Sequence, residues 1–437
     1  MRIMDKNILR KVNLLNWLHA EVKPALGCTE PVAIAFAAAT AAQRVEGNLL
    51  HMFGNISKNL FKNANGVLLP GTKKRGVTTA AALGFISGNA DLGLEVLRDV
   101  LPEDIQQAET LIAENKIKIT TIDSEELIYV DLTVITESAQ CRVVIKGAHT
   151  HITQISVNNI ETFRAPELCP EGSASQLKPF TVNEAVTFIK SVPVADIAFM
   201  TAAIDLNSAL SAEGQKRPYG LNVSGTLCQA IADGMSKQCL LNQIAIDAAA
   251  ASDARMGGAP LPAMSNFGSG NQGIVATMPV VTLARHLVSS SETTLRAVTL
   301  SHLVAISIHA RYARLSALCA ASTAAMGAAA GMAWLFTQDE TVIACAIKNM
   351  ISDISGMVCD GASGTCAMKV STAATSAIKS VLMATNGISA GSYDGIVDDE
   401  LEQSINHLCQ LTEIAMKQTD RQIIQIISDK ASAESAN

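Results

Sequence analysis

Three cysteines in the second half of the sequence have the surroundings of iron–sulfur ligands. Cys319, Cys359 and Cys366 lie beside glycine-rich breaks, and the last two share a stretch rich in glycine and small hydroxyl residues. Thiolates are soft ligands for iron–sulfur clusters or zinc, and glycines let backbone N–H groups approach cluster sulfurs. The spacing differs from the Cys-x₂-Cys pairs of zinc ribbons and ferredoxins. Three thiolates would leave one iron open as a Lewis acid, whereas the alternative is three buried structural cysteines.

Cys28 is a candidate of a different kind, because it lies in Gly-Cys-Thr-Glu-Pro directly before an expected helix. The dipole of that helix would stabilise the thiolate. Glu30 is two residues further on and could share a proton with the thiol. We therefore expect Cys28 and Glu30 to be catalytic, with Cys28 as nucleophile or general base. The alternative is a small buried residue at a turn.

The segment Ser252–Gly273 combines glycines with small polar side chains between apolar helices. Its glycines match the dinucleotide-binding fingerprint only formally, since no strand precedes them. An anion site is the better interpretation, in which backbone N–H groups and side chains hold a carboxylate and Arg255 clamps it. The predicted substrate-binding residues are Arg255, Ser265, Asn266, Ser269, Gly270 and Asn271. The alternative, a tight helix connection, explains the glycines but not the polar side chains.

Other side chains are weaker candidates. Lys369 could suggest a pyridoxal phosphate Schiff base, but the rest of a phosphate site is missing. His302 and His309 share one helical face without a carboxylate partner and are interpreted as core or surface residues. His149 and His151 are expected on one face at a strand edge, as metal ligands, as a cover for the site, or as structural residues.

The elements that must position these residues fall into three parts. Residues 1–45 are predicted as two helices that pack on the catalytic domain. Residues 46–165 are predicted as an α+β subdomain with an antiparallel sheet, from strand-like runs at 50–56, 117–122, 128–136, 141–145 and 150–157. A proline-rich linker is expected at 162–180, and residues 166–437 are predicted as a helical catalytic domain. The fold class is α+β.

Composition excludes several classes of protein. The chain of 437 residues has 33 Lys and Arg against 40 Asp and Glu, a net charge of −7, and only 4% aromatic residues, so we expect no nucleic-acid partner. Ten cysteines are too few for a disulfide scaffold in a chain this long, which favours the cytoplasm. The uncharged run 315–336 could span a bilayer by length, but its Ala, Gly and Ser favour a buried core helix, so no membrane partner is expected.

Several long motifs resemble those of the bacterial and archaeal L-cysteine desulfidase family, which belongs with the iron–sulfur L-serine dehydratases (alpha-chain superfamily). They are Glu21–Pro31, Asn207–Gly214, Ser252–Gly273, Arg314–Gly327 and Met357–Ser371, and the resemblance covers nearly the whole chain. It implies a [4Fe–4S] cluster held by Cys319, Cys359 and Cys366, with one iron free for substrate. It also implies that Cys28 is the acid/base residue.

The expected reaction is elimination of sulfide from L-cysteine, which gives pyruvate and ammonia after hydrolysis. The alternatives are dehydration of L-serine with the same cluster, a non-catalytic iron–sulfur sensor, and thiols that bind zinc or nothing. The expected partner is a small amino-acid substrate, and a homodimer is possible.

Overall fold

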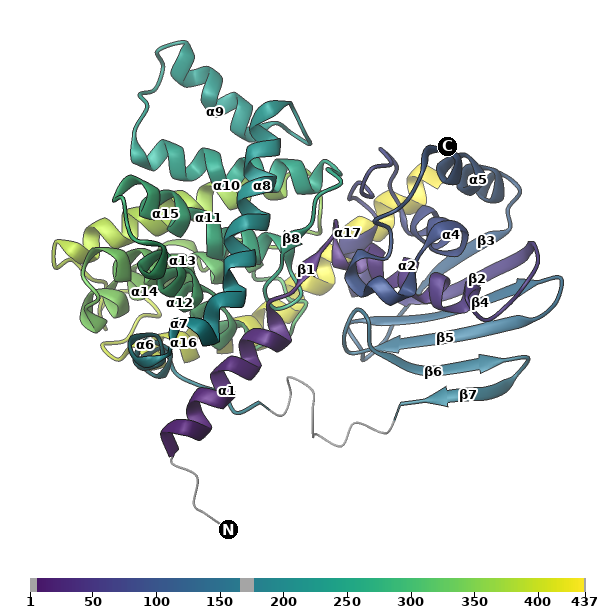
Figure 1. Cartoon of the computed structure of the whole chain (residues 1–437), viewed down its shortest axis with the longest axis horizontal. Helices are drawn as coiled ribbons and strands as arrows, with labels where there is room; N and C mark the ends of the chain where they lie inside the picture. Colours follow the sequence, from purple (N-terminus) through teal and green to yellow (C-terminus); the bar gives the residue numbers. More distant parts are fainter. Residues whose placement is uncertain (1–5, 166–176, 436–437) are drawn as a thin grey trace.

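The computed structural model describes residues 6–165 and 177–435, which form two bodies lying side by side (Figure 1). The larger body is helical, and the smaller one is a sheet with helices on one face. Each body has its own hydrophobic core. The predicted α+β fold class is confirmed. The linker predicted at 162–180 lies largely outside the described residues.

The smaller body is built on a six-stranded sheet in the order β3-β2-β4-β5-β6-β7. Its strands are β2 (Leu49–Ser57), β3 (Ile117–Ile122), β4 (Tyr129–Thr136), β5 (Gln140–Lys146), β6 (Ile152–Val157) and β7 (Ile160–Arg164). Neighbouring strands are antiparallel, as predicted, except for the parallel pair β2 and β3. A parallel pair needs a crossover connection, and helices provide it here. They are α3 (Lys58–Ala64), α4 (Val77–Ser87), η1 (Ala90–Glu95) and α5 (Pro102–Ala113).

All five strands predicted from the sequence form, with bounds within two residues of those expected. Pro102 is the first residue of α5, a position that suits a proline because its missing N–H would have no partner within the helix. The sequence analysis missed β7, whose five residues are all exposed. A strand without a buried face leaves no hydrophobic alternation to detect.

The larger body packs its helices around α13 (Ala320–Phe336), which is buried over 14 of its 17 residues. The surrounding helices are α6 (Val182–Ser191), α8 (Thr201–Lys216), α9 (Val223–Ala232), α10 (Leu240–Met256), α11 (Gly270–His286), α12 (Ser291–His309), α14 (Glu340–Ile354), α15 (Cys366–Thr385) and α16 (Leu401–Gln410). Small residues allow close approach, since a Cβ at Gly331 would lie 2.6 Å from the Ala297 carbonyl oxygen of α12. The run 315–336 therefore contains a core helix, as predicted.

Among the described residues, one helical run, Val194–Lys216, is long and apolar enough to cross a membrane by length and composition alone, whereas Ala320–Phe336 is too short. The run Val194–Lys216 consists of α7 (Val194–Ile197), η3 (Ala198–Met200) and α8. A single run of this kind is weak evidence for a membrane span.

The two predicted N-terminal helices belong to different bodies. α1 (Lys6–Glu21) contributes Leu14, Trp17 and Leu18 to the core of the helical body. α2 (Thr29–Ala42) lies instead in the core of the smaller body, where it packs on α4 and the sheet. This differs from the expectation that both helices pack on the catalytic domain. An Ala-rich helix that is buried on every side does not reveal its neighbours by periodicity.

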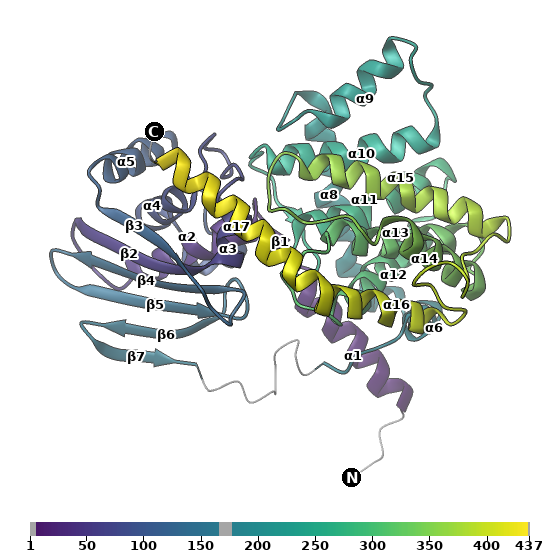
Figure 2. The same cartoon turned by 180° about the vertical axis from the view of Figure 1, so that it is seen from behind.

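Among residues 6–165 and 177–435, two features of secondary structure link the bodies. The short strands β1 (Pro24–Ala25) and β8 (Ala263–Met264) pair antiparallel between α1 and α11. On the opposite side, α16 continues through η4 (Leu411–Ala415) into α17 (Met416–Ser435), which runs from the helical body to α3 (Figure 2). There the buried Lys62 ammonium lies 2.6 Å from the Asp420 carboxylate. The C-terminal helix therefore holds the smaller body against the larger one.

Candidate active site

The structure brings the three predicted ligand cysteines to one cavity. Cys319 directly precedes α13, Cys366 is the first residue of α15, and Cys359 lies in the segment between α14 and α15. Two backbone hydrogen bonds join the segments around Cys319 and Cys359, which are 40 residues apart in the chain. The Cys319 N–H donates to the Met357 carbonyl oxygen at 2.9 Å, and the Cys359 N–H donates to that of Ala317 at 2.7 Å.

Lys369, which lies on α15, binds the segment that carries Cys359. Its ammonium donates to the Val358 carbonyl oxygen at 2.8 Å and pairs with the Asp360 carboxylate, so it holds the residues on both sides of Cys359. Burial alone would lower the pKa of Lys369, but the hydrogen bond and charge of Asp360 outweigh it and raise the pKa. A Schiff-base lysine needs a lowered pKa, and this one has a structural role.

The cavity has a volume of about 90 Å³ and lies where the two bodies meet. Residues from both bodies line it, among them Cys28, Thr29, Glu30, Asn63, His149, Arg255, Phe267, Ser269, Asn271, His309, Arg314, Cys319, Cys359 and Cys366. The N-termini of α2, α11, α13 and α15 all reach it, at Cys28, Ser269, Cys319 and Cys366 respectively. Helix N-termini carry partial positive charge, so this cavity favours anionic groups.

The donor set fits a cluster better than a single ion. Among residues 6–165 and 177–435, no three His, Cys, Asp or Glu side chains are close enough together to hold one metal ion. Burial raises the pKa of Cys319 to about 12, and the neighbouring Cys359 and Cys366 thiols add to the rise. Burial also raises the pKa of Cys366. Burial disfavours the charged form of Cys319 and Cys366, so a cationic centre would be needed to hold these side chains as thiolates, as thiolate-bound metal groups provide.

Cys28 departs from its predicted electrostatics. It directly precedes α2, as expected, but it is 4% exposed, and burial raises the pKa of its thiol to about 12. Arg255 offsets part of this rise, since its Nη2 lies 3.4 Å from the Cys28 Sγ. The predicted lowering of the pKa by the helix dipole is therefore wrong, because loss of hydration outweighs the dipole in a closed site.

Arg255 is the most unusual charged group in the cavity. Arg255 is only 4% exposed. Among the described residues, its guanidinium forms no ion pair with a carboxylate at 4.0 Å or less. Its Nη2 donates to the Gly27 carbonyl oxygen at 2.9 Å, and its Nε has no hydrogen-bond partner. A buried charge without a counter-ion is costly, so Arg255 is placed to receive an anionic ligand.

Glu30 lies in the first turn of α2 and faces the smaller body. Its Oε1 lies 3.8 Å from the Nε2 of His149, and its Oε2 accepts a hydrogen bond from the Thr29 hydroxyl at 3.2 Å. Burial opposes ionisation of Glu30, but the interactions with His149, together with Arg255, outweigh it and lower the pKa. Glu30 is therefore a carboxylate at neutral pH.

The two histidines of the turn between β5 and β6, His149 and His151, have different surroundings. His149 is 5% exposed and lines the cavity, whereas the Nδ1 of His151 lies 2.9 Å from the Lys146 carbonyl oxygen. The expectation that both point to one face is wrong, because residues 147–150 form a turn and β6 begins only at Ile152.

The six predicted substrate-binding residues do not all reach the cavity. Arg255, Ser269 and Asn271 line it. Gly270 leaves space for Arg255, since a Cβ there would lie 2.6 Å from the Arg255 Cζ.

Ser265 and Asn266 hold the loop instead. The Ser265 hydroxyl donates to the Lys23 carbonyl oxygen at 2.6 Å, and the Asn266 side-chain amide donates to the His302 Nδ1 at 3.0 Å. Both side chains are fully used by interior partners and do not line the cavity.

His302 is a core residue, as interpreted from the sequence, while His309 lines the cavity. The Nε2 of His302 lies 2.9 Å from the Thr277 hydroxyl, and the ring of His309 is stacked between Phe267 and Tyr312. Burial lowers the pKa of both histidines to about 3, so both are neutral.

Arg314 is a cavity residue that the sequence analysis did not single out, although it lies in one of the resemblance motifs. Its two terminal nitrogens lie 3.0 and 2.8 Å from the two carboxylate oxygens of Glu21, and its Cζ lies 4.1 Å from the centre of the Phe267 ring. Its charge is therefore already balanced, in contrast to that of Arg255.

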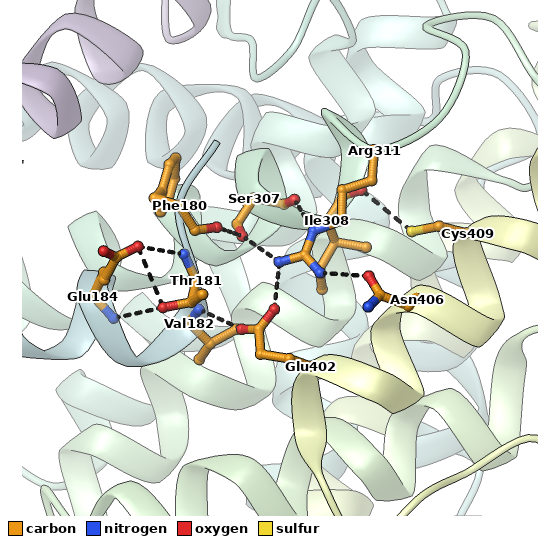
Figure 3. A network of polar contacts seen from close by, with 10 residues as sticks. All are labelled: Phe180, Thr181, Val182, Glu184, Ser307, Ile308, Arg311, Glu402, Asn406 and Cys409. Carbon is orange, nitrogen blue, oxygen red and sulfur yellow. Dashed lines mark hydrogen bonds and ion pairs between the residues drawn. The ribbon is translucent and has the colours of Figure 1, made fainter. Parts of the chain in front are cut away.

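Arg311, which lies two residues after the end of α12, is held by side chains of α16 (Figure 3). Arg311 donates to Glu402 at 2.5 Å and to Asn406 at 3.0 Å. Glu402 also accepts the Val182 N–H of α6 at 2.8 Å. These contacts fix the end of α12 relative to the cavity wall.

A family model described as serine dehydratase alpha chain matches residues 91–425. The chain belongs to the serine dehydratase alpha chain family. Membership in this family indicates an enzyme of the dehydratase or lyase type. The match supports the serine dehydratase part of the resemblance, whereas the L-cysteine desulfidase part stays a prediction.

Relatives of similar length carry the name UPF0597. A UPF0597 protein of Klebsiella pneumoniae subsp. pneumoniae is 52% identical over 416 residues, which are 95% of this chain and 98% of the relative. A UPF0597 protein of Actinobacillus pleuropneumoniae is 46% identical, with 94% and 95% covered. The UPF0597 protein YhaM of Escherichia coli O1:K1 / APEC is 48% identical with the same coverage.

Proposed function

We propose that this protein is an L-cysteine desulfidase, which eliminates sulfide from L-cysteine and gives pyruvate and ammonia. One observation carries the proposal: four thiols, among them the three candidate ligands, line one small cavity together with a buried guanidinium that has no carboxylate partner among the described residues. The resemblance implies a [4Fe–4S] cluster on Cys319, Cys359 and Cys366, and their common cavity supports this ligand set. When bound, the cluster supplies a Lewis-acidic iron for the leaving group.

The chain's own residues bind and orient the amino acid. Arg255, which has no carboxylate partner among the described residues, receives the α-carboxylate, and the N-terminus of α11 at Ser269 and Asn271 adds N–H donors and side-chain polar atoms. The small volume of the cavity, about 90 Å³, limits the substrate to a small side chain. The resemblance proposes Cys28 as the acid/base residue, and Glu30 is the neighbouring carboxylate that the sequence offers beside it.

Dehydration of L-serine is the second candidate, because the family that matches 91–425 is described as serine dehydratase alpha chain. Both reactions remove the Cα proton and a β-substituent, so the same cavity serves either. Sulfur binds iron more strongly than a hydroxyl does, which favours L-cysteine.

The test is product formation by anaerobically reconstituted protein, with L-cysteine and L-serine in parallel and D-cysteine as control. Equal amounts of sulfide and pyruvate from L-cysteine, dependent on iron, are expected. Pyruvate from L-serine alone would establish the dehydratase instead. No product from either amino acid, with an intact cluster present, would overturn both reactions and favour a sensor.

A further inference from the structure

The imidazole of His149 reaches the cavity from the smaller body, on the turn between β5 and β6. Its two nitrogens have different surroundings. The Nε2 faces the Glu30 carboxylate at 3.8 Å. The Nδ1 hydrogen-bonds to no described residue and lies beside the loop before α11, since a Cβ at Gly268 would be 3.6 Å from it.

This arrangement fixes the tautomer. Nε2 is buried and makes no hydrogen bond, and the Glu30 carboxylate at 3.8 Å is the acceptor that it faces. The proton of a neutral imidazole is therefore most stable on Nε2, which leaves the lone pair on Nδ1. A carboxylate that orients an imidazole in this way is the usual arrangement of a histidine base, and such contacts are often long before substrate binds.

The other basic groups that line the cavity are already engaged. The Cys28 Sγ lies 3.4 Å from the Arg255 Nη2. His309 has its Nδ1 2.7 Å from the Gln272 side-chain oxygen, and its ring is covered on both faces. The two Glu30 oxygens face Thr29 and His149. Of these candidates, His149 combines an Nδ1 without a hydrogen bond to any described residue with a neighbouring carboxylate that would stabilise its protonated form.

We propose that His149 is the base that removes the Cα proton of the substrate and that Glu30 is its positioning residue. This inference rests on the proposed function, and it assigns the proton transfer to His149 rather than Cys28. The Nδ1 lone pair forms the new N–H bond, and the electron pair of the Cα–H bond forms the Cα=Cβ double bond. The Cβ–S bond breaks, and its electron pair leaves with the sulfur. Glu30 stabilises the resulting imidazolium.

The kinetic test compares His149→Ala with His151→Ala in reconstituted full-length protein. His151 is the matched control, because it lies on the same turn and bonds only to a backbone carbonyl oxygen. In His149→Ala we expect kcat to fall by about 10²–10⁴-fold while KM changes by less than about threefold. The iron and sulfide content should stay at the wild-type level, and added imidazole should restore part of kcat. A kcat for His149→Ala within about threefold of the wild type would overturn the proposal.

A second measurement is independent of turnover. NMR of the full chain with ¹⁵N-labelled histidine, before cluster reconstitution, identifies His149 as the signal lost in His149→Gln. We expect the neutral Nε2–H tautomer, and a mixture of tautomers in Glu30→Gln. A neutral Nδ1–H form in the wild type would overturn the proposed orientation. An inactive wild type would overturn the proposed function and this role together, whereas an active wild type with an active His149→Ala would overturn this role alone.

Discussion

Replacing Gly270 by alanine tests whether the position of Arg255 controls catalysis. A Cβ at this position would lie 2.6 Å from the Arg255 Cζ, whereas ordinary contact begins at 3.4 Å. The guanidinium must therefore move by at least about 0.8 Å, since the Arg255 Nε lies even closer to the added Cβ than the Cζ does. Misplacement of a binding group by about 1 Å costs roughly 100-fold in rate, or about 2.7 kcal/mol of transition-state stabilisation. We expect kcat/KM for the preferred amino acid to fall by about this factor.

The fold should tolerate this substitution, because Gly270 is the first residue of α11 and alanine is the better helix former by up to about 1 kcal/mol. Steady-state kinetics and thermal unfolding of the same preparations separate the two effects. Gly356→Ala is the matched control, since nothing lies within 4 Å of its added Cβ. In an Arg255→Gln background, Gly270→Ala should add less than about twofold, because both changes act on one group. A further 100-fold loss there, or wild-type kcat/KM in the single variant, would refute the reasoning.

Three other changes have defined outcomes. Cys359→Ser should prevent cluster assembly, measured as iron and visible absorption after reconstitution, whereas Cys345→Ser, on α14 outside the cavity, should assemble normally. Asp420→Ala leaves the buried Lys62 ammonium without its 2.6 Å partner, so the free energy of unfolding measured in urea should fall by about 3–5 kcal/mol; an unchanged value would show that the pair does not join the two bodies. The folded-state pKa values of His302 and His309 lie near 3, so both groups stabilise the fold above pH 6.5 and that contribution is lost as pH falls toward 3. At pH 5.5 the free energy of unfolding should therefore be about 3 kcal/mol lower than at pH 7.5, and equal values would contradict neutral burial of these histidines.

Local patterns in the sequence were sufficient for much of the fold. The alternation of β-branched residues predicted β2 to β6, and Pro102 marked the start of α5. These features depend on neighbours within a few residues of each other. β7 could not be predicted in this way, because an exposed edge strand is defined only by its pairing with β6.

In the candidate site, too, the sequence predicted what depends on residue type and did not predict what depends on distant contacts. The chemistry of Cys28, Arg255, Cys319, Cys359 and Cys366 was visible in residue types and motifs. Their electrostatics was not, because the pKa of the Cys28 thiol depends on burial by segments far away in the chain rather than on the helix that it precedes.

Packing alone decided which polar side chains reach the cavity. Ser265 and Asn266 are in the same loop as Ser269, but the interior satisfies their hydrogen bonds, whereas Ser269 lies at the start of α11 beside Arg255. His149 joins the site only because the turn of one body docks against the other. The sequence by itself determined the strands and the chemistry-bearing residues, since both follow from local composition. Only the tertiary structure determined which of those residues meet, because their contacts, burial and charges come from segments more than 100 residues apart in the chain.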